Sequence, residues 1–172
     1  EFELAFGQNN PEAGKLAVAS LESATKAIKD GQIDVLVTAP INKSNRQSET
    51  FSFPGHTDYL AKELGAEALM FMVSGHLRVG LLTDHIAVSK VSDAITTKLI
   101  RSKVATMMKS LREDFGIIRP KIALLGINPH SGDNGTIGEE DEKIMKPAVV
   151  ELFEEGHLVF GPFAADGFFG SN

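Results

Sequence analysis

Residues 121–132, KIALLGINPHSG, combine an apolar run with a turn that carries a histidine. Residues 121–127 are typical of a strand buried in a sheet, and the Asn, Pro, Ser and Gly that follow are turn-forming residues. In open α/β sheets, ligands bind beyond the carboxyl ends of the strands, because several loops converge there. The stretch therefore predicts an α/β fold with a candidate site at His130.

Two other histidines lie in similar surroundings. His85 follows an apolar run over residues 77–83, and His56 lies at the start of a short helix predicted over residues 57–64. The chain has only five histidines, so three of them in such places are the leading candidates for function.

The first helix is predicted from its boundary residues. Asn10 can cap it, Pro11 takes its first position and Gly31 follows its end. The next residues, 33–38, form a nearly continuous apolar run and predict a strand buried on both faces. The inward stripe of the helix, at helical spacing, is predicted as Leu16, Ala17, Leu21, Ala24 and Ile28.

Helices and strands are also predicted along the rest of the chain. Gly75-His76 between two apolar runs is typical of a type II′ hairpin, so the sheet should be mixed. Pro147 should kink the last helix. We therefore predict a three-layer α/β/α fold with a mixed sheet, in a single α/β unit over residues 1–172. The elements are strands over residues 68–74, 77–83 and 121–127, a helix over 96–115 capped by Thr96, a helix ending at 155 and an extended piece over 158–160.

Composition and charge exclude several classes of function. The chain has 172 residues, a net charge of −6 and a pI near 5.4, without a basic stripe, so we expect no nucleic-acid partner. It has no cysteine, which excludes disulfides and thiolate metal sites and fits a cytoplasmic protein. No apolar run approaches the roughly 20 residues of a membrane helix, so we expect no membrane association. The sequence does not begin with Met, and we expect it to be an excerpt of a longer protein.

His85 and His130 are candidates for a divalent-metal site. They follow separate predicted strands, so the fold could bring them together, and neutral imidazole is the commonest protein ligand of such metals. Catalytic zinc sites use about three protein ligands, so Asp84, Asp166 or a partner chain would have to complete the set. The alternative is that each histidine is a hydrogen-bonded loop residue.

Residues 54–58, PGHTD, suit the binding of an anion. They enter a helix, where backbone amides are free and the dipole is positive, and His56 and Thr57 could donate to the same anion. The alternative is that Thr57 only caps the helix. Lys43, after the strand predicted over residues 33–38, could also approach an anion or remain in solvent.

Two further patterns have ordinary interpretations. The glycines after His130 do not form a dinucleotide fingerprint, and no G-x-G pair occurs in the chain, so no conventional Rossmann NAD site is predicted. The acidic residues at 139–142 are interpreted as solvated charge that matches the dipole of a helix N-terminus.

Together these segments resemble the 4-hydroxythreonine-4-phosphate dehydrogenase family of pyridoxal 5′-phosphate (vitamin B6) biosynthesis. The histidine-bearing stretches are long and specific, and the matches run in family order over nearly the whole chain. They are VTAPINK at 37–43, FPGHTDYLA at 53–61, LRVGL at 77–81, DAIT at 93–96, GINPHSG at 126–132 and GPFAAD at 161–166.

This resemblance implies an isocitrate or isopropylmalate dehydrogenase-like fold, which binds NAD without the glycine fingerprint. It implies a divalent metal (Zn, Mg or Co) and a homodimer whose site is shared between subunits. His56 and Thr57 match the substrate-binding pair, and His85 and His130 match two of three metal-binding histidines; the catalytic and cofactor-binding residues are unknown. The implied reaction is NAD-dependent oxidation of 4-phosphooxy-L-threonine, followed by decarboxylation to 3-amino-2-oxopropyl phosphate.

The sequence also departs from the family pattern. The family's N-terminal Gly-Asp-Pro-Ala-Gly run and the region with the third metal histidine are absent, so we expect an interior fragment of a longer two-domain dehydrogenase, inactive alone. Asp84 stands where relatives often carry Thr, and Gly167 replaces another Thr. Two alternatives stay open: a paralogous dehydrogenase for phosphorylated threonate or erythronate, and a non-catalytic module that binds a phosphorylated ligand.

Overall fold

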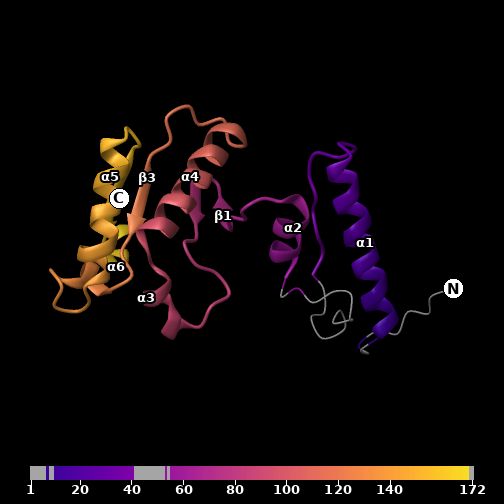
Figure 1. Cartoon of the computed structure of the whole chain (residues 1–172), viewed down its shortest axis with the longest axis horizontal. Coiled ribbons are helices and arrows are strands. Elements are labelled where there is room, and N and C mark those ends of the chain that lie inside the picture. Colours follow the sequence, from indigo (N-terminus) through magenta and orange to yellow (C-terminus); the bar gives the residue numbers. More distant parts are fainter. Residues whose placement is uncertain (1–6, 8–9, 41–52, 54, 171–172) are drawn as a thin grey trace. The chain divides into compact units, whose positions relative to one another are not determined.

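A computed structural model describes residues 7, 10–40, 53 and 55–170 of the chain (Figure 1). The chain divides into two compact units, residues 1–68 and residues 69–172, and each is described by itself. Helices and strands are both present, which confirms the predicted α/β class. A single unit over residues 1–172 and isocitrate dehydrogenase-like layering stay predictions.

Helix α1 (Pro11–Lys29) begins and ends where the sequence predicts. The side chain of Asn10 accepts a hydrogen bond from the Glu12 amide at 2.9 Å, and Pro11 takes the first helical position. Asp30 caps the C-terminal end, and Gly31 follows with φ +67°. Residues with a Cβ adopt this left-handed conformation only at a cost, so the glycine ends the helix there.

The buried face of α1 differs in part from the predicted stripe. Leu21 is buried as predicted, but Leu16 is 50% exposed, and the other buried positions are Gly14 and Thr25. Leu21 packs with Tyr59 of α2 (His56–Leu64) in a small core. Ala17, Ala24 and Ile28 are half-buried, so Leu16 is the exposed member of the predicted stripe.

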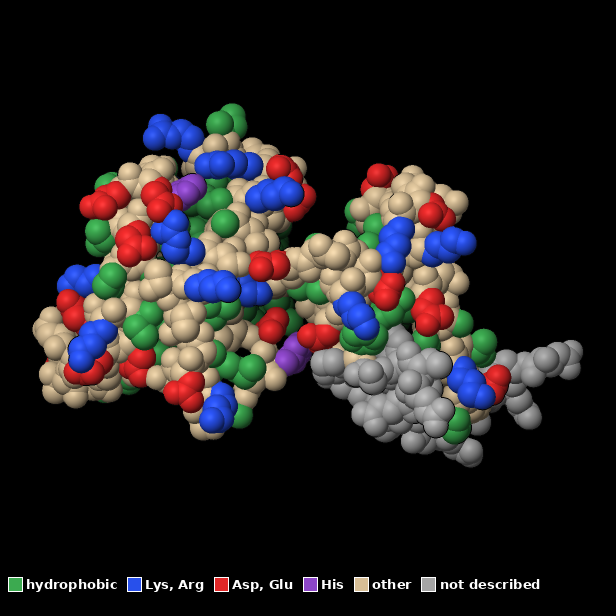
Figure 2. Space-filling view, viewed as in Figure 1, with side chains coloured by type: hydrophobic (Ala, Val, Ile, Leu, Met, Phe, Trp, Pro, Cys, Tyr) green, Lys and Arg blue, Asp and Glu red, His purple; other side chains and the backbone are tan. Residues whose placement is uncertain are grey.

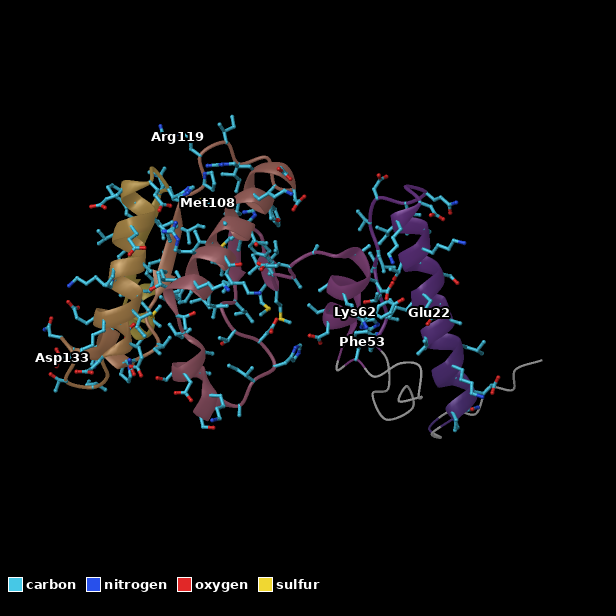
Figure 3. The ribbon with its side chains drawn as sticks, viewed as in Figure 1. Glu22, Phe53, Lys62, Met108, Arg119 and Asp133 are labelled. Carbon is cyan, nitrogen blue, oxygen red and sulfur yellow. The ribbon has the colours of Figure 1, made fainter. Side chains whose placement is uncertain are left out.

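Aromatic contacts extend this small core (Figure 3). The rings of Phe53 and Tyr59 meet edge to face, with centroids 5.4 Å apart. The Lys62 ammonium lies 5.0 Å from the centroid of the Phe53 ring, within the range of a cation–π contact.

The strand predicted over residues 33–38 is wrong. The segment joins no ladder among the described residues, and Val35 and Val37 are 73% and 90% exposed. An apolar run becomes a buried strand only when neighbouring strands pair with its backbone and other elements cover both faces. The described part of residues 1–68 contains α1 and α2 but no second strand that could pair with this segment.

A β-hairpin opens the second unit, as predicted. Strand β1 (Phe71–Ser74) pairs antiparallel with β2 (Leu77–Gly80), with Ser74 opposite Leu77. Gly75 has φ +52°, which the first turn position of a type II′ hairpin requires. Both strands are shorter than predicted, and η1 (Val88–Lys90) and α3 (Val91–Ala94) follow β2.

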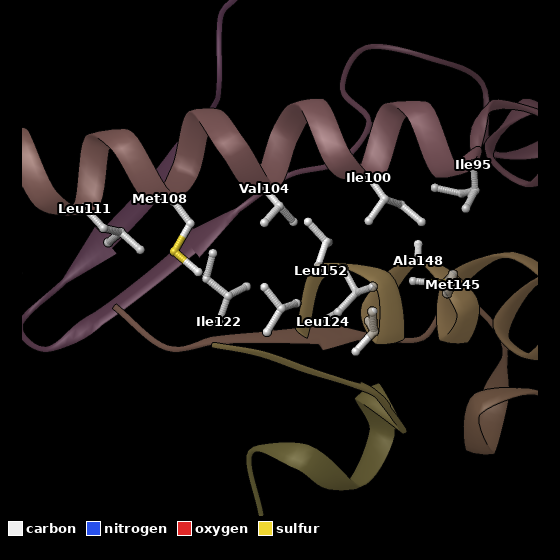
Figure 4. Packing of buried hydrophobic residues seen from close by; sticks show 12 residues of the cluster. Ile95, Ile100, Val104, Met108, Leu111, Ile122, Leu124, Met145, Ala148 and Leu152 are labelled. Carbon is white, nitrogen blue, oxygen red and sulfur yellow. The ribbon is translucent and has the colours of Figure 1, made fainter. Parts of the chain in front are cut away.

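Helix α4 (Thr97–Glu113) carries the core of this unit (Figure 4). Thr96 caps it as predicted, because its Oγ1 accepts a hydrogen bond from the Leu99 amide at 3.1 Å. Its inward face packs in one cluster with residues of the strand and helix that follow. The cluster of buried residues comprises Ile95, Ile100, Val104, Met108, Leu111, Ile122, Leu124, Met145, Ala148, Val149, Leu152 and Val159.

The elements after α4 form a parallel β-α-β unit. Strand β3 (Ile122–Leu125) pairs in parallel with β4 (Val159–Phe163), and α6 (Ala165–Phe168) follows β4. The connection between the strands holds η2 (Pro129–Gly132), η3 (Asp141–Met145) and α5 (Lys146–Glu154). The backbone changes from π-helical to α-helical at Lys146, just before Pro147, and the kink at Pro147 stays a prediction.

The described strands lie in two separate two-stranded sheets, where the sequence predicts one mixed sheet. Antiparallel and parallel pairing are both present, but β2 and β3 do not pair. A cavity of about 530 Å³ is lined mostly by apolar residues of β2, β3 and α4.

The surface mixes charges of both signs. On the face shown in Figure 2, Lys and Arg side chains alternate with Asp and Glu over the described residues. One ion pair joins Arg101 of α4 to Glu155, with a distance of 2.7 Å between the guanidinium and the carboxylate. None of the described helices has both the length and the apolar character needed to cross a bilayer.

Candidate functional site

His130 lies in a turn with an unusual backbone. The turn follows β3, and His130 and Ser131 have φ of +51° and +53°. Residues with a Cβ adopt this left-handed region rarely, at a cost of roughly 1–2 kcal/mol each. Two successive residues in this region must be held by surrounding contacts. Such positions cluster at functional sites, so the backbone itself points to this turn.

The buried carboxylate of Asp141 holds the chain just before this turn. Asp141 is 1% exposed and begins η3. Its Oδ1 accepts a hydrogen bond from the Ile127 amide at 3.0 Å. Its Oδ2 accepts from the backbone amide of Asn128 at 3.1 Å and from the side-chain amide of Asn128 at 2.8 Å. A buried carboxylate with three donors is a strong anchor.

Two glycines allow this close packing. A Cβ at Gly126 would collide with the Asp141 carboxylate and the Ser131 hydroxyl, and a Cβ at Gly138 would collide with the Asn128 side chain. The glycines therefore let the two ends of the loop approach the carboxylate.

The interpretation of residues 139–142 as solvated charge is wrong for two of the four. Asp141 is buried, and Glu140 is bound to neighbouring side chains. Glu139 and Glu142 do lie on the surface, where they pair with lysines four residues later at 2.6 and 2.7 Å. The buried acid is the only aspartate among three glutamates, but a run of acids at the start of a helix does not by itself indicate which member is buried.

The structure brings His130 and Asp166 together. Asp166 lies in α6, directly after β4, and its Oδ2 is 2.8 Å from Nδ1 of His130. Strands β3 and β4 are parallel neighbours, so the residues that follow their carboxyl ends meet at one edge. In neutral His130, Nδ1–H donates to the carboxylate and Nε2 remains a free lone-pair donor. The His130 side chain is 71% exposed and accessible to a ligand.

Removing the Asp166 carboxylate should disorder this imidazole. In the complete protein, we expect Asp166→Ala to weaken divalent-metal affinity by about 10- to 100-fold, because the hydrogen bond that fixes ring orientation and tautomer is lost. Titration with Zn²⁺ against a chromophoric chelator measures the change. Unchanged affinity would show that the 2.8 Å contact does not orient a metal ligand.

His85 is also in the left-handed region, with φ +50°, in the loop between β2 and η1. Its side chain is exposed, and Asp84 precedes it. Within the described ranges, no three His, Asp or Glu side chains form a group that could hold a metal ion. Metal binding by His85 and His130 therefore stays a prediction.

Glu140 joins the two segments that carry these histidines. Its Oε1 accepts a hydrogen bond from the Ser92 hydroxyl, and its Oε2 accepts one from the Asn128 side-chain amide at 2.9 Å. These hydrogen bonds, the one from Ser92 first, lower the pKa of Glu140 from its usual 4.5 to about 2. Glu140 is therefore ionised at neutral pH.

The lowered pKa of Glu140 predicts a pH dependence of stability. Its folded-state pKa of about 2 lies below the usual 4.5, so the ionised carboxylate stabilises the fold above pH 4.5 and loses this effect as the pH falls toward 2. We expect the difference in unfolding free energy between wild type and Glu140→Gln to shrink over that interval. Urea denaturation of both proteins at several pH values measures it, and a difference independent of pH would contradict the assigned pKa.

His56 and Thr57 begin helix α2 in the first unit. The N-cap is Gly55, in an extended conformation without a side-chain capping bond, so the interpretation of Thr57 as the cap is wrong. Both residues lie in the first turn, where amides have no intrahelical acceptor. Pro54 and Lys43 lie outside the described residues.

The profile of the family described as pyridoxal phosphate biosynthetic protein PdxA matches residues 1–172. The chain belongs to this family. A curated PdxA-family relative, the 4-hydroxythreonine-4-phosphate dehydrogenase of Bacteroides thetaiotaomicron, is 47% identical over 99% of this chain and 48% of its own length. The enzyme of that name from a Sulfurihydrogenibium species is 41% identical over 96% of this chain and 52% of its own length.

A solved structure agrees with this assignment to the PdxA family. The crystal structure of 4-hydroxythreonine-4-phosphate dehydrogenase from Klebsiella pneumoniae has a TM-score of 0.86 at 32% identity, covering 97% of this chain and 50% of that one. The chain spans about half the length of the curated relatives it matches. The predicted resemblance is thereby confirmed. The names of these relatives do not favour either alternative, the paralogous dehydrogenase or the non-catalytic binding module.

Proposed function

We propose that the complete protein is a 4-hydroxythreonine-4-phosphate dehydrogenase, an NAD- and divalent-metal-dependent oxidoreductase of pyridoxal 5′-phosphate biosynthesis. Membership of the PdxA family and the names of its relatives support this reaction class. The observation that carries the proposal is His130, held in a left-handed turn with its Nδ1 on Asp166. Metal-binding histidines are commonly oriented by a carboxylate in this way.

The donor set fits a divalent cation such as Zn, Mg or Co. Nε2 of His130 is free and accessible, and His85 offers a second imidazole on an exposed loop. A third ligand would come from outside residues 1–172 or from the partner subunit. When bound, the metal acts as a Lewis acid that lowers the cost of deprotonating the substrate 3-hydroxyl and of carrying negative charge as CO₂ leaves.

His56 and Thr57 are proposed to bind the substrate phosphate. Both lie in the first turn of α2, where the amides are free and the dipole is positive. The N-cap Gly55 has no side chain that could compete for these amides. Imidazole and hydroxyl donors beside free amides would hold the phosphate and orient the carbon chain of the substrate.

The proposed reaction oxidises 4-phosphooxy-L-threonine at the carbon that bears the 3-hydroxyl and then releases CO₂ from the resulting β-keto acid, giving 3-amino-2-oxopropyl phosphate. NAD supplies the hydride acceptor, and the residues of its site are unassigned. We further propose that the protein is a cytoplasmic homodimer in which both subunits contribute to the site. Residues 1–172 alone are proposed to be catalytically inactive.

An assay of the complete protein tests this proposal. We expect NADH formation with 4-phosphooxy-L-threonine, little with 4-phospho-erythronate, and loss of the activity after treatment with a chelator, with recovery on adding Zn²⁺, Mg²⁺ or Co²⁺. Activity that survives full removal of metal would overturn the metal role. NADH formation with 4-phospho-erythronate and not with 4-phosphooxy-L-threonine would show that the proposed substrate is wrong. The absence of reaction with either compound would reject the proposed dehydrogenase activity.

A further inference from the structure

The loops that carry His85 and His130 are tied together by polar side chains. Ser92 in α3 lies seven residues after His85, and Asn128 lies two residues before His130. One carboxylate oxygen of Glu140 accepts from Ser92 and the other accepts from Asn128 at 2.9 Å. Among the described residues, no other side-chain hydrogen bond joins these two segments.

The partner groups of Glu140 are themselves held in place. The side-chain amide of Asn128 also donates to buried Asp141 at 2.8 Å, which fixes the direction of its N–H groups. On the other side, Ile95 at the end of α3 is 2% exposed and belongs to the same core as Met145 of η3 (Figure 4). Glu140 therefore bridges two anchored elements and not two mobile loops.

We propose that Glu140 is a positioning residue that sets the spacing between His85 and His130. This inference rests on the proposed function, in which both histidines bind one metal ion. A metal site needs its ligands within about 0.5 Å of the productive geometry, and an ionised bridge between two ligand-bearing segments restrains them. Both oxygens of the carboxylate accept in this bridge, and the negative charge strengthens both hydrogen bonds.

The competing explanation is that Glu140 only stabilises the start of η3. That role would change the unfolding temperature and leave the metal affinity untouched. Glu139 is a matched control: it is the same residue type, one position earlier, and its carboxylate pairs with Lys143 at 2.6 Å on the surface.

The test compares Glu140→Gln with Glu139→Gln in the complete protein. Glutamine has the same shape but no charge and one acceptor oxygen, so the bond with Ser92 can persist only as a neutral one that the amide donates, and the charge-assisted bridge is lost. We expect Glu140→Gln to weaken Zn²⁺ affinity by about 3- to 10-fold, in addition to the loss of stability that the lowered pKa of Glu140 predicts. This is a smaller effect than that of removing Asp166, the direct hydrogen-bond partner of His130. Glu139→Gln should match wild type, and competition with a chromophoric chelator measures each affinity.

Two further variants complete the test. Ser92→Ala should weaken affinity in the same direction, and the double variant Ser92→Ala/Glu140→Gln should lose less than the two effects combined, because both act on one bridge. Wild-type affinity in Glu140→Gln, or an equal loss in Glu139→Gln, overturns the inference. His130→Ala distinguishes failure of the proposed function from failure of the role of Glu140. If His130→Ala also binds Zn²⁺ normally, the proposed function fails. If His130→Ala is the one variant that loses affinity, only the role of Glu140 is rejected.

Discussion

Replacing His130 by alanine in the complete protein is expected to weaken divalent-metal affinity by more than about 100-fold and to abolish NAD reduction. This effect is larger than the one expected for Asp166→Ala, which removes only the hydrogen-bond partner of the imidazole. The imidazole is the group that Asp166 orients at 2.8 Å, and alanine offers no nitrogen in its place. Added metal at high concentration should restore little activity. Metal content after dialysis and the rate of NADH formation are the measurements.

His76→Ala is the control for this experiment. His76 lies in the turn of the β1–β2 hairpin and is exposed, so its loss removes an imidazole without touching the turn after β3. We expect wild-type metal content and activity. If His76→Ala and His130→Ala behave alike, metal binding does not depend on the site described here.

The second large effect is expected from Asp141→Ala, which should lower the free energy of unfolding by about 3 kcal/mol. The variant leaves two backbone amides and the Asn128 side chain without the acceptor that the buried Asp141 provides. Urea denaturation followed by circular dichroism measures the change. Because the turn holds His130, metal affinity should fall as well.

Two variants calibrate that result. Asp141→Asn keeps one acceptor oxygen and should lose less stability than alanine. Glu142→Ala removes an exposed acid of the same helical turn, whose pair with Lys146 lies on the surface, and should change stability by less than about 0.5 kcal/mol. Equal losses in Asp141→Ala and Glu142→Ala would mean that burial of the carboxylate does not stabilise the turn.

Local elements were predictable where the interactions that decide them span a few residues. The cap at Asn10, the cap at Thr96 and the turn at Gly75 act on neighbouring backbone groups, so α1, α4 and the hairpin are located correctly. Residues 33–38 show the limit of this reasoning. Their composition suits a buried strand, but pairing needs a neighbour from elsewhere, and the described residues of the first unit contain none.

The candidate site divides in the same way. The sequence by itself determined the family, the strand that leads to His130 and the presence of turn residues around it, because these depend on residue type and order. Only the tertiary structure decided that Asp166 meets His130, that Asp141 is buried while Glu142 is solvated, and that Glu140 bridges Ser92 and Asn128. These contacts join residues 12 to 48 positions apart in the chain, and their formation depends on parallel pairing of β3 with β4 and on packing in the core, which no local pattern encodes.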